Sequence, residues 1–189
     1  NIINVNICSL GGSIATPKGG IKAKVVEVKN LEELKPLSGR GEVKKIKKDK
    51  KKFYLVDESY NSSPSALITA IENLNEIKFK LNKKILVIGD MLELGKLSKE
   101  MHIKIIPTII EVQPRLVITV GNSSEIISKN LPKNIKTFHF KKVFFVYNRL
   151  IEEIQDHDIV AIKGSNCIKL SDLSRRIIIG QLMFHYFFI

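Results

Sequence analysis

The sequence predicts a doubly wound α/β domain built on a mostly parallel sheet. From Phe53 onward, short apolar runs alternate with amphipathic segments long enough to form a helix in each connection. Connections of this kind join parallel strands by right-handed crossovers. The carboxyl ends of the strands should therefore meet at one rim of the sheet.

Five apolar runs are expected to form the parallel strands. The clearest is 84–88, because a continuous apolar run of that length suits a strand covered on both faces. Residues 44–46 should pair with the first run as a hairpin at one edge of the sheet. The five runs are 53–56, 84–88, 115–120, 136–140 and 158–162.

The helices are predicted from apolar spacing and end signals. Pro64 opens a segment in which Leu67, Ile71 and Leu74 recur at helical spacing, and proline is favoured in a first helical turn. A second helix should run over 98–110 with Ser98 as its cap. Further helices are expected at 122–129, at 143–154 and from 171 to about 187.

Residues 1–38 differ from the rest of the chain in composition. Glycines and a proline crowd one stretch, and no convincing helix precedes Leu31. We interpret 1–38 as the remnant of a preceding domain, cut off from its core and poorly ordered, and 39–189 as the α/β domain. The crowded residues are Gly11, Gly12, Pro17, Gly19 and Gly20.

The composition is that of an ordinary globular protein, with 44% hydrophobic and 26% charged residues. The net charge of +12 invites a nucleic-acid interpretation, but the one dense basic run, 44–52, contains no aromatic residue. Charge runs are usually solvated surface, so a solvated hairpin is favoured over a nucleic-acid patch.

The two cysteines, Cys8 and Cys167, cannot build a disulfide framework, which favours a reduced, cytoplasmic setting. We expect no signal peptide and no membrane span, because the apolar end at 183–189 is far shorter than the ~20 residues that a span needs. No metal site is predicted, since His102 has no second histidine or cysteine near it.

Polar clusters follow four of the predicted strands. They lie at 57–61, 89–93, 121–122 and 163–165, and all should face the same rim. Open α/β sheets bind ligands outside the carboxyl ends of their strands, where carboxylates can accept bonds from ribose and Lys163 can meet a phosphate or carboxylate. The alternative is that Asp57 and Asp90 only cap the turns that follow them. For a single aspartate we favour that alternative, whereas four clusters together favour a binding edge.

These clusters carry a family resemblance. The elements Gly39-Arg40-Gly41-Glu42, Asp57-Glu58-Ser59-Tyr60-Asn61 with Pro64, Gly89-Asp90-Met91-Leu92-Glu93-Leu94-Gly95, and Lys163-Gly164-Ser165 occur in this order. Together they resemble the carboxyl-terminal domain of the Mur ligases, and within that family the members that add D-alanyl-D-alanine. Ser98 and His102 also fall where that family has a serine and a histidine. The resemblance covers residues 34–178. A related superfamily ligase such as folylpolyglutamate synthase is the alternative, and the Gly-Asp-Met element makes it less favoured.

The resemblance implies an ATP-dependent ligase that joins D-alanyl-D-alanine to UDP-N-acetylmuramoyl-tripeptide through an acyl phosphate. It implies that Arg40 reaches the ATP phosphates, and that Asp57, Tyr60 and Asn61 lie near the ribose and base. A rim on the substrate side, without individual chemical roles, would comprise Gly89, Asp90, Glu93, Lys163, Gly164 and Ser165.

Two substitutions and one absence depart from the family pattern. Ser63 precedes Pro64 where the family has asparagine, and Asn166 replaces an arginine. The family's phosphate-binding loop is absent, since 12–18 only approaches its pattern. ATP and Mg²⁺ would therefore be held mainly by a central domain, which with an amino-terminal domain would be the partner. On its own the chain is expected to be inactive. The other possibilities are a non-catalytic remnant or a stand-alone binding module.

Overall fold

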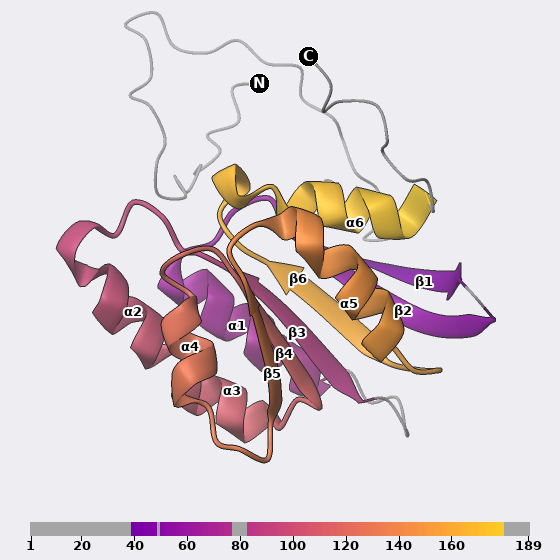
Figure 1. Ribbon diagram of the computed structural model, residues 1–189, viewed down its shortest axis with the longest axis horizontal. Coiled ribbons are helices and arrows are strands. Elements are labelled where there is room, and N and C mark those ends of the chain that lie inside the picture. The colour runs from indigo at the N-terminus through magenta and orange to yellow at the C-terminus, as the bar shows by residue number, and fades with distance from the viewer. Residues whose placement is uncertain (1–38, 49, 77–82, 180–189) are drawn as a thin grey trace, which may run out of the picture. The chain divides into compact units, whose positions relative to one another are not determined.

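The computed structural model describes residues 39–48, 50–76 and 83–179. Within them lies a six-stranded sheet in the order β1-β2-β6-β3-β4-β5, flanked by helices (Figure 1). The interpretations of 1–38, of the 12–18 loop and of the apolar end at 183–189 concern residues outside the described ones.

The sheet confirms the predicted fold class. Five strands are parallel, and only the edge strand β1 is antiparallel, pairing with β2 so that Ile46 lies opposite Phe53. The expected edge hairpin is therefore present. The strands are β1 (Glu42–Lys48), β2 (Lys51–Glu58), β3 (Lys84–Gly89), β4 (Leu116–Val120), β5 (Lys136–Phe140) and β6 (Ile159–Lys163).

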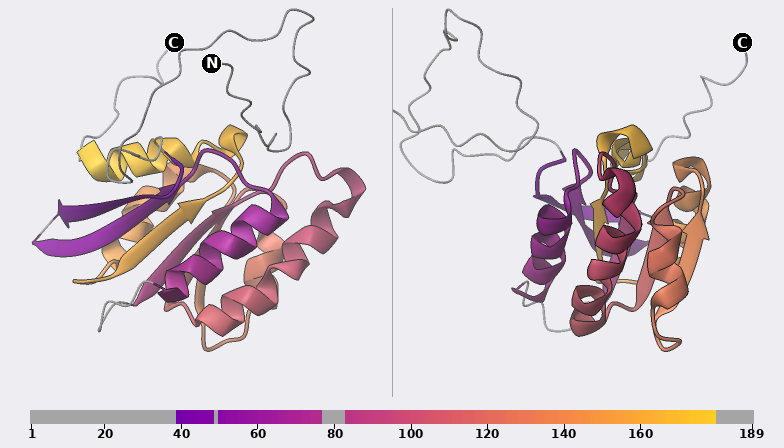
Figure 2. Two further views of the ribbon diagram at one scale, coloured as in Figure 1. Left: turned by 180° about the vertical axis from the view of Figure 1, so that it is seen from behind. Right: turned by 90° about the vertical axis from the view of Figure 1, so that its left-hand side faces the viewer.

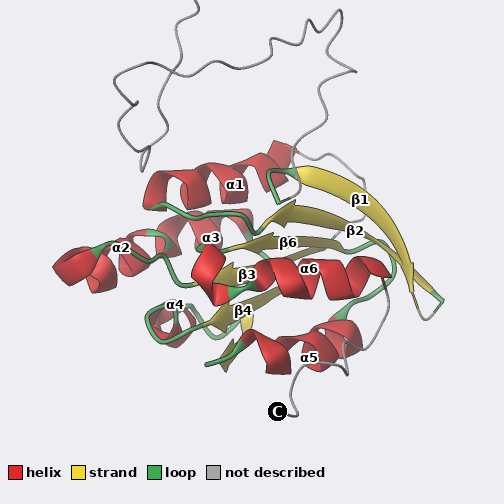
Figure 3. Cartoon of the chain, turned by 90° about the horizontal axis from the view of Figure 1, so that it is seen from above, coloured by secondary structure: helices red, strands yellow, loops and turns green. Residues whose placement is uncertain are grey.

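Helices cover both faces of the sheet (Figures 2 and 3). Alternate residues of the buried strands serve the two faces, so in β3 Ile85 and Val87 pack with α5 and α6, while Leu86 and Ile88 pack with α1 and α3. This arrangement explains why the central strands are continuously apolar. The helices are α1 (Pro64–Glu76), α2 (Ser98–Lys104), α3 (Ile106–Val112), α4 (Glu125–Asn130), α5 (Val146–Glu153) and α6 (Leu170–Ile179).

The helix predicted over 98–110 is two helices, which meet at Ile105. Pro107 has no N–H to donate to the carbonyl of Ile103, and its ring crowds that carbonyl, so the first helix cannot continue. The predicted cap was wrong, because Ser98 is the first residue of α2 and Leu97 occupies the cap position. Short 3-10 turns, η2 (Gly95–Leu97) and η3 (Val143–Phe145), lead into α2 and α5.

The predicted helix 122–129 begins only at Glu125, because residues 122–124 make other hydrogen bonds described below. The last helix, α6, ends at Ile179 within the described part of the chain. None of the helices in that part has the length and apolar character needed to cross a bilayer.

Neighbouring isoleucines of α3 test how the core is built. Ile109 is fully buried and Ile110 is 41% exposed. We expect Ile109→Ala to lower the free energy of unfolding by about 2–5 kcal/mol, because it removes buried methyl groups and leaves a cavity. Ile110→Ala should change it by about 0.5 kcal/mol or less. Urea denaturation of both variants measures the difference, and equal effects would contradict the packing described here.

Candidate functional site

The strand β6 marks a switch point in the sheet. After β2 and β3 the chain enters helices on one face, whereas after β6 it enters α6 on the other. The connection that follows β6 and those that follow its neighbours β2 and β3 therefore leave the carboxyl ends of the strands toward opposite faces of the sheet. Ligands of open α/β sheets bind at such a point, and the four predicted polar clusters lie along this rim.

Three of the predicted nucleotide-side residues come together at the end of β2. The N–H of Gly41 donates to the carbonyl of Asp57 at 2.8 Å, and the N–H of Tyr60 donates to the carbonyl of Gly39 at 3.1 Å. These bonds place the guanidinium carbon of Arg40 4.4 Å from the centre of the Tyr60 ring, a cation–π contact. Arg40 is exposed and Tyr60 is half exposed, so both can still meet a ligand.

The backbone around Arg40 depends on glycine. Gly39 and Gly41 have φ angles of +79° and +83°, a region that side chains with a Cβ rarely adopt. A Cβ on Gly39 would also lie 3.1 Å from the backbone nitrogen of Tyr60. The Gly-Arg-Gly sequence thus turns the chain sharply and presents the arginine between two hydrogen-bonded anchors.

The two polar residues nearest this turn differ in exposure. Asp57 is buried, and its Oδ1 accepts the N–H of Ser59 at 3.1 Å, so it caps the following turn as the alternative interpretation expected. Asn61 is exposed, and its Oδ1 accepts the N–H of Ser62 at 2.8 Å. Its side-chain amide still has two N–H donors for a ligand.

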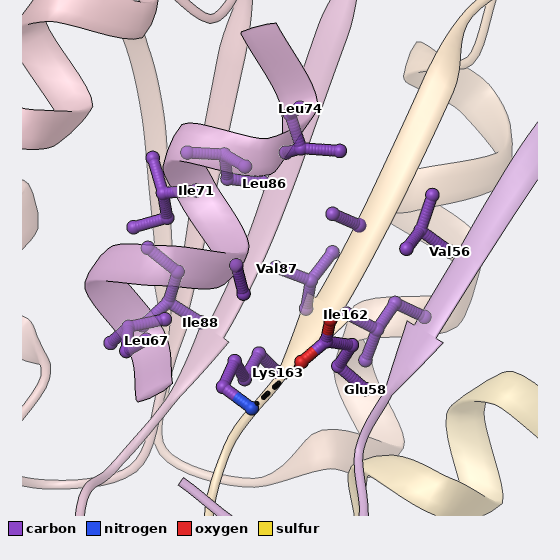
Figure 4. A pocket seen from close by; sticks show the side chains of 12 residues that line it. Val56, Glu58, Leu67, Ile71, Leu74, Leu86, Val87, Ile88, Ile162 and Lys163 are labelled. Atoms are coloured by element: carbon purple, nitrogen blue, oxygen red, sulfur yellow. Dashed lines mark hydrogen bonds and ion pairs between the residues drawn. The ribbon is translucent and has the colours of Figure 1, made fainter. Parts of the chain in front are cut away.

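Lys163 does not project freely from the rim. Its Nζ lies 3.0 Å from Oε2 of Glu58 and 3.1 Å from the carbonyl of Asn61, and its side chain is 9% exposed (Figure 4). The expectation concerned a phosphate or carboxylate of a ligand, whereas the carboxylate that Lys163 contacts here belongs to the protein's own Glu58. The lysine fastens the end of β6 to the loop that carries Tyr60.

Sequence reasoning missed the partner of this lysine. Glu58 lies inside a family motif whose sequence indicates no role for it, but the pairing of β2 with β6 places it directly beside Lys163. The cavity next to the pair measures about 20 Å³, room for roughly one water molecule. Apolar side chains of α1 and the sheet line the rest of that cavity (Figure 4), so no nucleotide fits there.

Asp90 is the most fully bonded residue of the rim. Its carboxylate accepts the backbone N–H groups of Asn122, Ser123 and Ser124 at 2.9, 3.1 and 2.7 Å, and the residue is 4% exposed. Consecutive N–H groups of this kind form a typical anion site. Here the protein's own carboxylate fills it. The same residue's carbonyl accepts the N–H of Ser165 at 3.0 Å, so Asp90 connects the ends of β3, β4 and β6.

Two more buried side chains hold the loop after Asp90. Nε2 of His102 accepts the N–H of Met91 at 3.1 Å, so the ring proton must lie on Nδ1, which donates to the carbonyl of Ser98 at 2.7 Å. Oγ of Ser165 accepts the N–H of Leu92 at 2.9 Å. His102 therefore holds this loop in place from a buried position.

The predicted rim glycines serve close packing of the backbone. A Cβ on Gly164 would lie 2.8 Å from the Cα of Gly89 and 2.7 Å from a methyl group of Leu170. Glu93 differs from these residues, because it is exposed and has a φ of +64°. Among the described residues, no group of three or more His, Cys, Asp or Glu is arranged to hold a metal ion.

Comparison with known proteins assigns the family. The family model described as "Mur ligase, glutamate ligase domain" matches residues 39–166, well over half of the chain. The chain belongs to the Mur ligase family.

The relatives are ligases with one named reaction. The UDP-N-acetylmuramoyl-tripeptide--D-alanyl-D-alanine ligase of Rickettsia prowazekii is 28% identical over 148 residues, covering 78% of this chain and 32% of the relative. The corresponding ligase of Bacillus subtilis is 29% identical over 131 residues, covering 68% and 28%. The chain thus spans about a third of the length of these relatives.

Solved structures of Mur ligases share this fold. The MurF ligase from Thermotoga maritima in complex with ADP has a TM-score of 0.65 and 26% identity, covering 82% of this chain and 34% of its own. MurF from Acinetobacter baumannii, at 20% identity and a TM-score of 0.62, shares the fold, covering 78% of this chain and 32% of its own.

The two departures of this Mur ligase domain from the family pattern both lie on the rim. The hydroxyl of Ser63 accepts the N–H of Ala66 at 3.3 Å, so the serine caps the start of α1. Serine and asparagine are both strong helix caps, so this exchange preserves the local structure. Asn166 is exposed directly after Ser165 and leaves the rim without the arginine that the family pattern carries there.

Two glycines of this domain test the Asp90 connection. A Cβ on Gly121 would lie 2.3 Å from the Asp90 carboxylate, whereas a Cβ on Gly95 would meet nothing within 4 Å, and both have positive φ. We expect Gly95→Ala to cost about 1 kcal/mol of unfolding free energy. Gly121→Ala should cost about 3 kcal/mol, because strain and displacement of Asp90 add together. Urea denaturation checks this, and equal costs would show that Asp90 moves aside freely.

Proposed function

We propose that this chain is the carboxyl-terminal module of an ATP-dependent ligase that adds D-alanyl-D-alanine to UDP-N-acetylmuramoyl-tripeptide in peptidoglycan precursor synthesis, in the cytoplasm. The observation that carries the proposal is the exposed Arg40–Tyr60 pair, anchored to Asp57 at the switch point of a Mur ligase domain. The named reaction of the relatives supports the substrates.

Arg40, Tyr60 and Asn61 form the nucleotide end of the proposed site. A guanidinium stays charged and offers a planar fork of donors that matches phosphate oxygens. The contact with Tyr60 holds Arg40 at the rim while leaving it exposed. The Tyr60 ring and the Asn61 amide would meet the ribose and base, and Asp57 would keep their loop in place. ADP bound to the Thermotoga relative supports a nucleotide in this family.

The substrate side of the rim is proposed to act mainly through its shape. Asp90, Lys163 and Ser165 are buried and bonded to other parts of the rim, so they would hold the loops rather than touch the substrate. Glu93 is exposed and would face the reacting groups. Closure of this rim over the central domain would exclude water from the acyl phosphate and orient the amine that attacks it.

The described residues do not fit a magnesium site, because they contain no suitable carboxylate cluster. We therefore place Mg²⁺, together with most of the phosphate contacts, in the central ligase domain, and we derive no step through the ion. The partners of this chain are then the amino-terminal and central ligase domains, and the chain alone is expected to be inactive.

Mixing separate domains tests the proposal. The chain would be combined with the amino-terminal and central domains of the Rickettsia prowazekii relative, and ATP-dependent joining of D-alanyl-D-alanine to the UDP-tripeptide would be measured. We expect activity only in the mixture. Arg40→Ala should lower kcat/KM for ATP by about 100-fold, since it removes a charged donor from the phosphates.

The matched control is Arg175→Ala, which removes an exposed arginine of α6 that pairs with Asp172. It should leave kcat/KM unchanged. If both parts are folded and the intact relative is active, an inactive mixture would favour a non-catalytic binding module. An active mixture that tolerates Arg40→Ala would refute the role of this arginine.

A further inference from the structure

The hairpin of β1 and β2 concentrates positive charge. Its residues 44–52 include seven lysines and one aspartate, a net charge of +6, which is half of the +12 that the whole chain carries. The hairpin turns at the end of the sheet opposite the rim, because Lys48 pairs with Lys51, whereas Glu42 pairs with Asp57 at the carboxyl end of β2 (Figure 1). This charge therefore lies away from the nucleotide end of the proposed site.

Alternation along the two strands divides these lysines between two faces. One face packs through Ile46 into the core that α5 and α6 cover, and each of its lysines is held by another group of the domain. These are Lys44, 3.0 Å from the carboxylate of Glu42, Lys48, 5.1 Å from the centre of the Tyr147 ring, and Lys51, which donates to the carbonyl of Ile151 at 3.0 Å.

The opposite face of the hairpin presents lysines that the domain does not bind. Lys47 on β1 lies directly opposite Lys52 on β2, Lys45 is on the same face, and Lys50 lies in the turn. All four are exposed, and within 39–48, 50–76 and 83–179 none of them forms an ion pair. We name these four residues the lysine face.

Protection of a free sheet edge explains only part of the lysine face. β1 is an edge strand, and lysines on such a strand keep other strands from pairing with it. Lys52, however, lies on β2, which has a partner strand on either side, and Lys50 lies in the turn. Like charges directly opposite each other destabilise a sheet, as Lys47 and Lys52 do here. The hairpin therefore carries a repulsion that edge protection does not require and that an anionic partner would relieve.

The lysine face suits the surface of an anionic membrane. Its ammonium groups lie on one side of a two-stranded ribbon, where they can meet several headgroups at once, and each lysine near such a surface strengthens binding about fivefold. Val43 is on the same side of β1 and is 53% exposed, so it can enter the headgroup layer. Single-stranded nucleic acid fits less well, because it stacks on open aromatic rings. Phe53 is buried, and Tyr54 packs against the core beneath α1.

We propose that the lysine face docks on an anionic membrane surface. A patch of this kind attracts the surface through charge, so the binding is reversible and weakens as the salt concentration rises. Because the hairpin turns at the end of the sheet opposite the rim, docking leaves the rim open to the other ligase domains. The inference goes beyond the proposed function and does not depend on the ligase reaction.

Co-sedimentation of the full chain with lipid vesicles tests the docking. Vesicles that mix phosphatidylglycerol with phosphatidylcholine supply a negative surface, and vesicles of phosphatidylcholine alone supply a neutral one. We expect the chain to bind the negative vesicles at least about tenfold more tightly, and to be released as the salt is raised from about 0.05 to 0.5 M. Lys47→Gln/Lys52→Gln should weaken binding to the negative vesicles about 25-fold, since two lysine contacts are lost.

The matched control is Lys104→Gln/Lys133→Gln, which removes the same charge from exposed positions in α2 and in the loop before β5. It should leave vesicle binding unchanged within about twofold, because these lysines lie outside the lysine face. A second pair from the face, Lys45→Gln/Lys50→Gln, should weaken binding as much as the first pair does. The test therefore does not rest on the folding of a single variant.

Equal binding to neutral vesicles would overturn the inference, as would no binding to negative vesicles at low salt. An equal loss of binding in the control variant would also overturn it, because the net charge of the chain would then explain the attraction. Tighter binding to a DNA oligonucleotide than to negative vesicles, weakened by the same two pairs of substitutions, would assign the lysine face to nucleic acid instead.

Discussion

The carboxylate of Asp90 is the interaction on which the rest of the rim depends. A buried charge is tolerated only when it is paired or hydrogen-bonded, and here three consecutive N–H groups at 122–124 satisfy it. Because those groups bond to Asp90, α4 starts at Glu125, and Gly121 must lack a side chain. The Asp90 carbonyl in turn fixes Ser165. One residue thus sets the relative positions of three strand ends.

Exposure divides the polar residues of the rim into two groups. Those that hold the rim are buried and bonded within the protein, as Lys163 is to Glu58 and His102 is to the backbone at both ring nitrogens. Those left to meet ligands are exposed, and they lie at the nucleotide end and at Glu93. The lysine face lies at the other end of β2, so docking there leaves the rim open to the nucleotide and to the other ligase domains.

The fold could be predicted because strands that are buried on both faces have continuously apolar sequences. Continuous apolar runs indicated strands covered on both faces. In the structure, alternate residues of these strands pack into the two cores on opposite faces of the sheet, which confirms that prediction. The break between α2 and α3 could also have been predicted from Pro107. It was missed because the apolar spacing continues across the break. That the polar clusters share one rim followed from parallel topology alone, and the motifs in those clusters identified the family.

The roles of individual rim residues could not be predicted, because they depend on partners that are distant in the chain. Lys163 lies 105 residues from Glu58, and Asp90 lies more than 30 residues from the N–H groups it accepts. A strand-end aspartate looks the same in sequence whether its carboxylate faces a ligand or a turn. The lysine run at 44–52 likewise does not show which of its members the domain binds, because the groups that hold Lys48 and Lys51 come from α5.

Photolabelling tests the central claim, that the end of β2 faces the nucleotide, most directly. The domain mixture would be irradiated with 8-azido-ATP, and the labelled peptides of this chain would be identified by mass spectrometry. The account predicts label on the peptide that carries Tyr60 and Asn61, removed by excess ATP. Label on the lysine-rich hairpin at 44–52 instead, at the opposite end of β2, would contradict it, because simple charge attraction would then explain the binding.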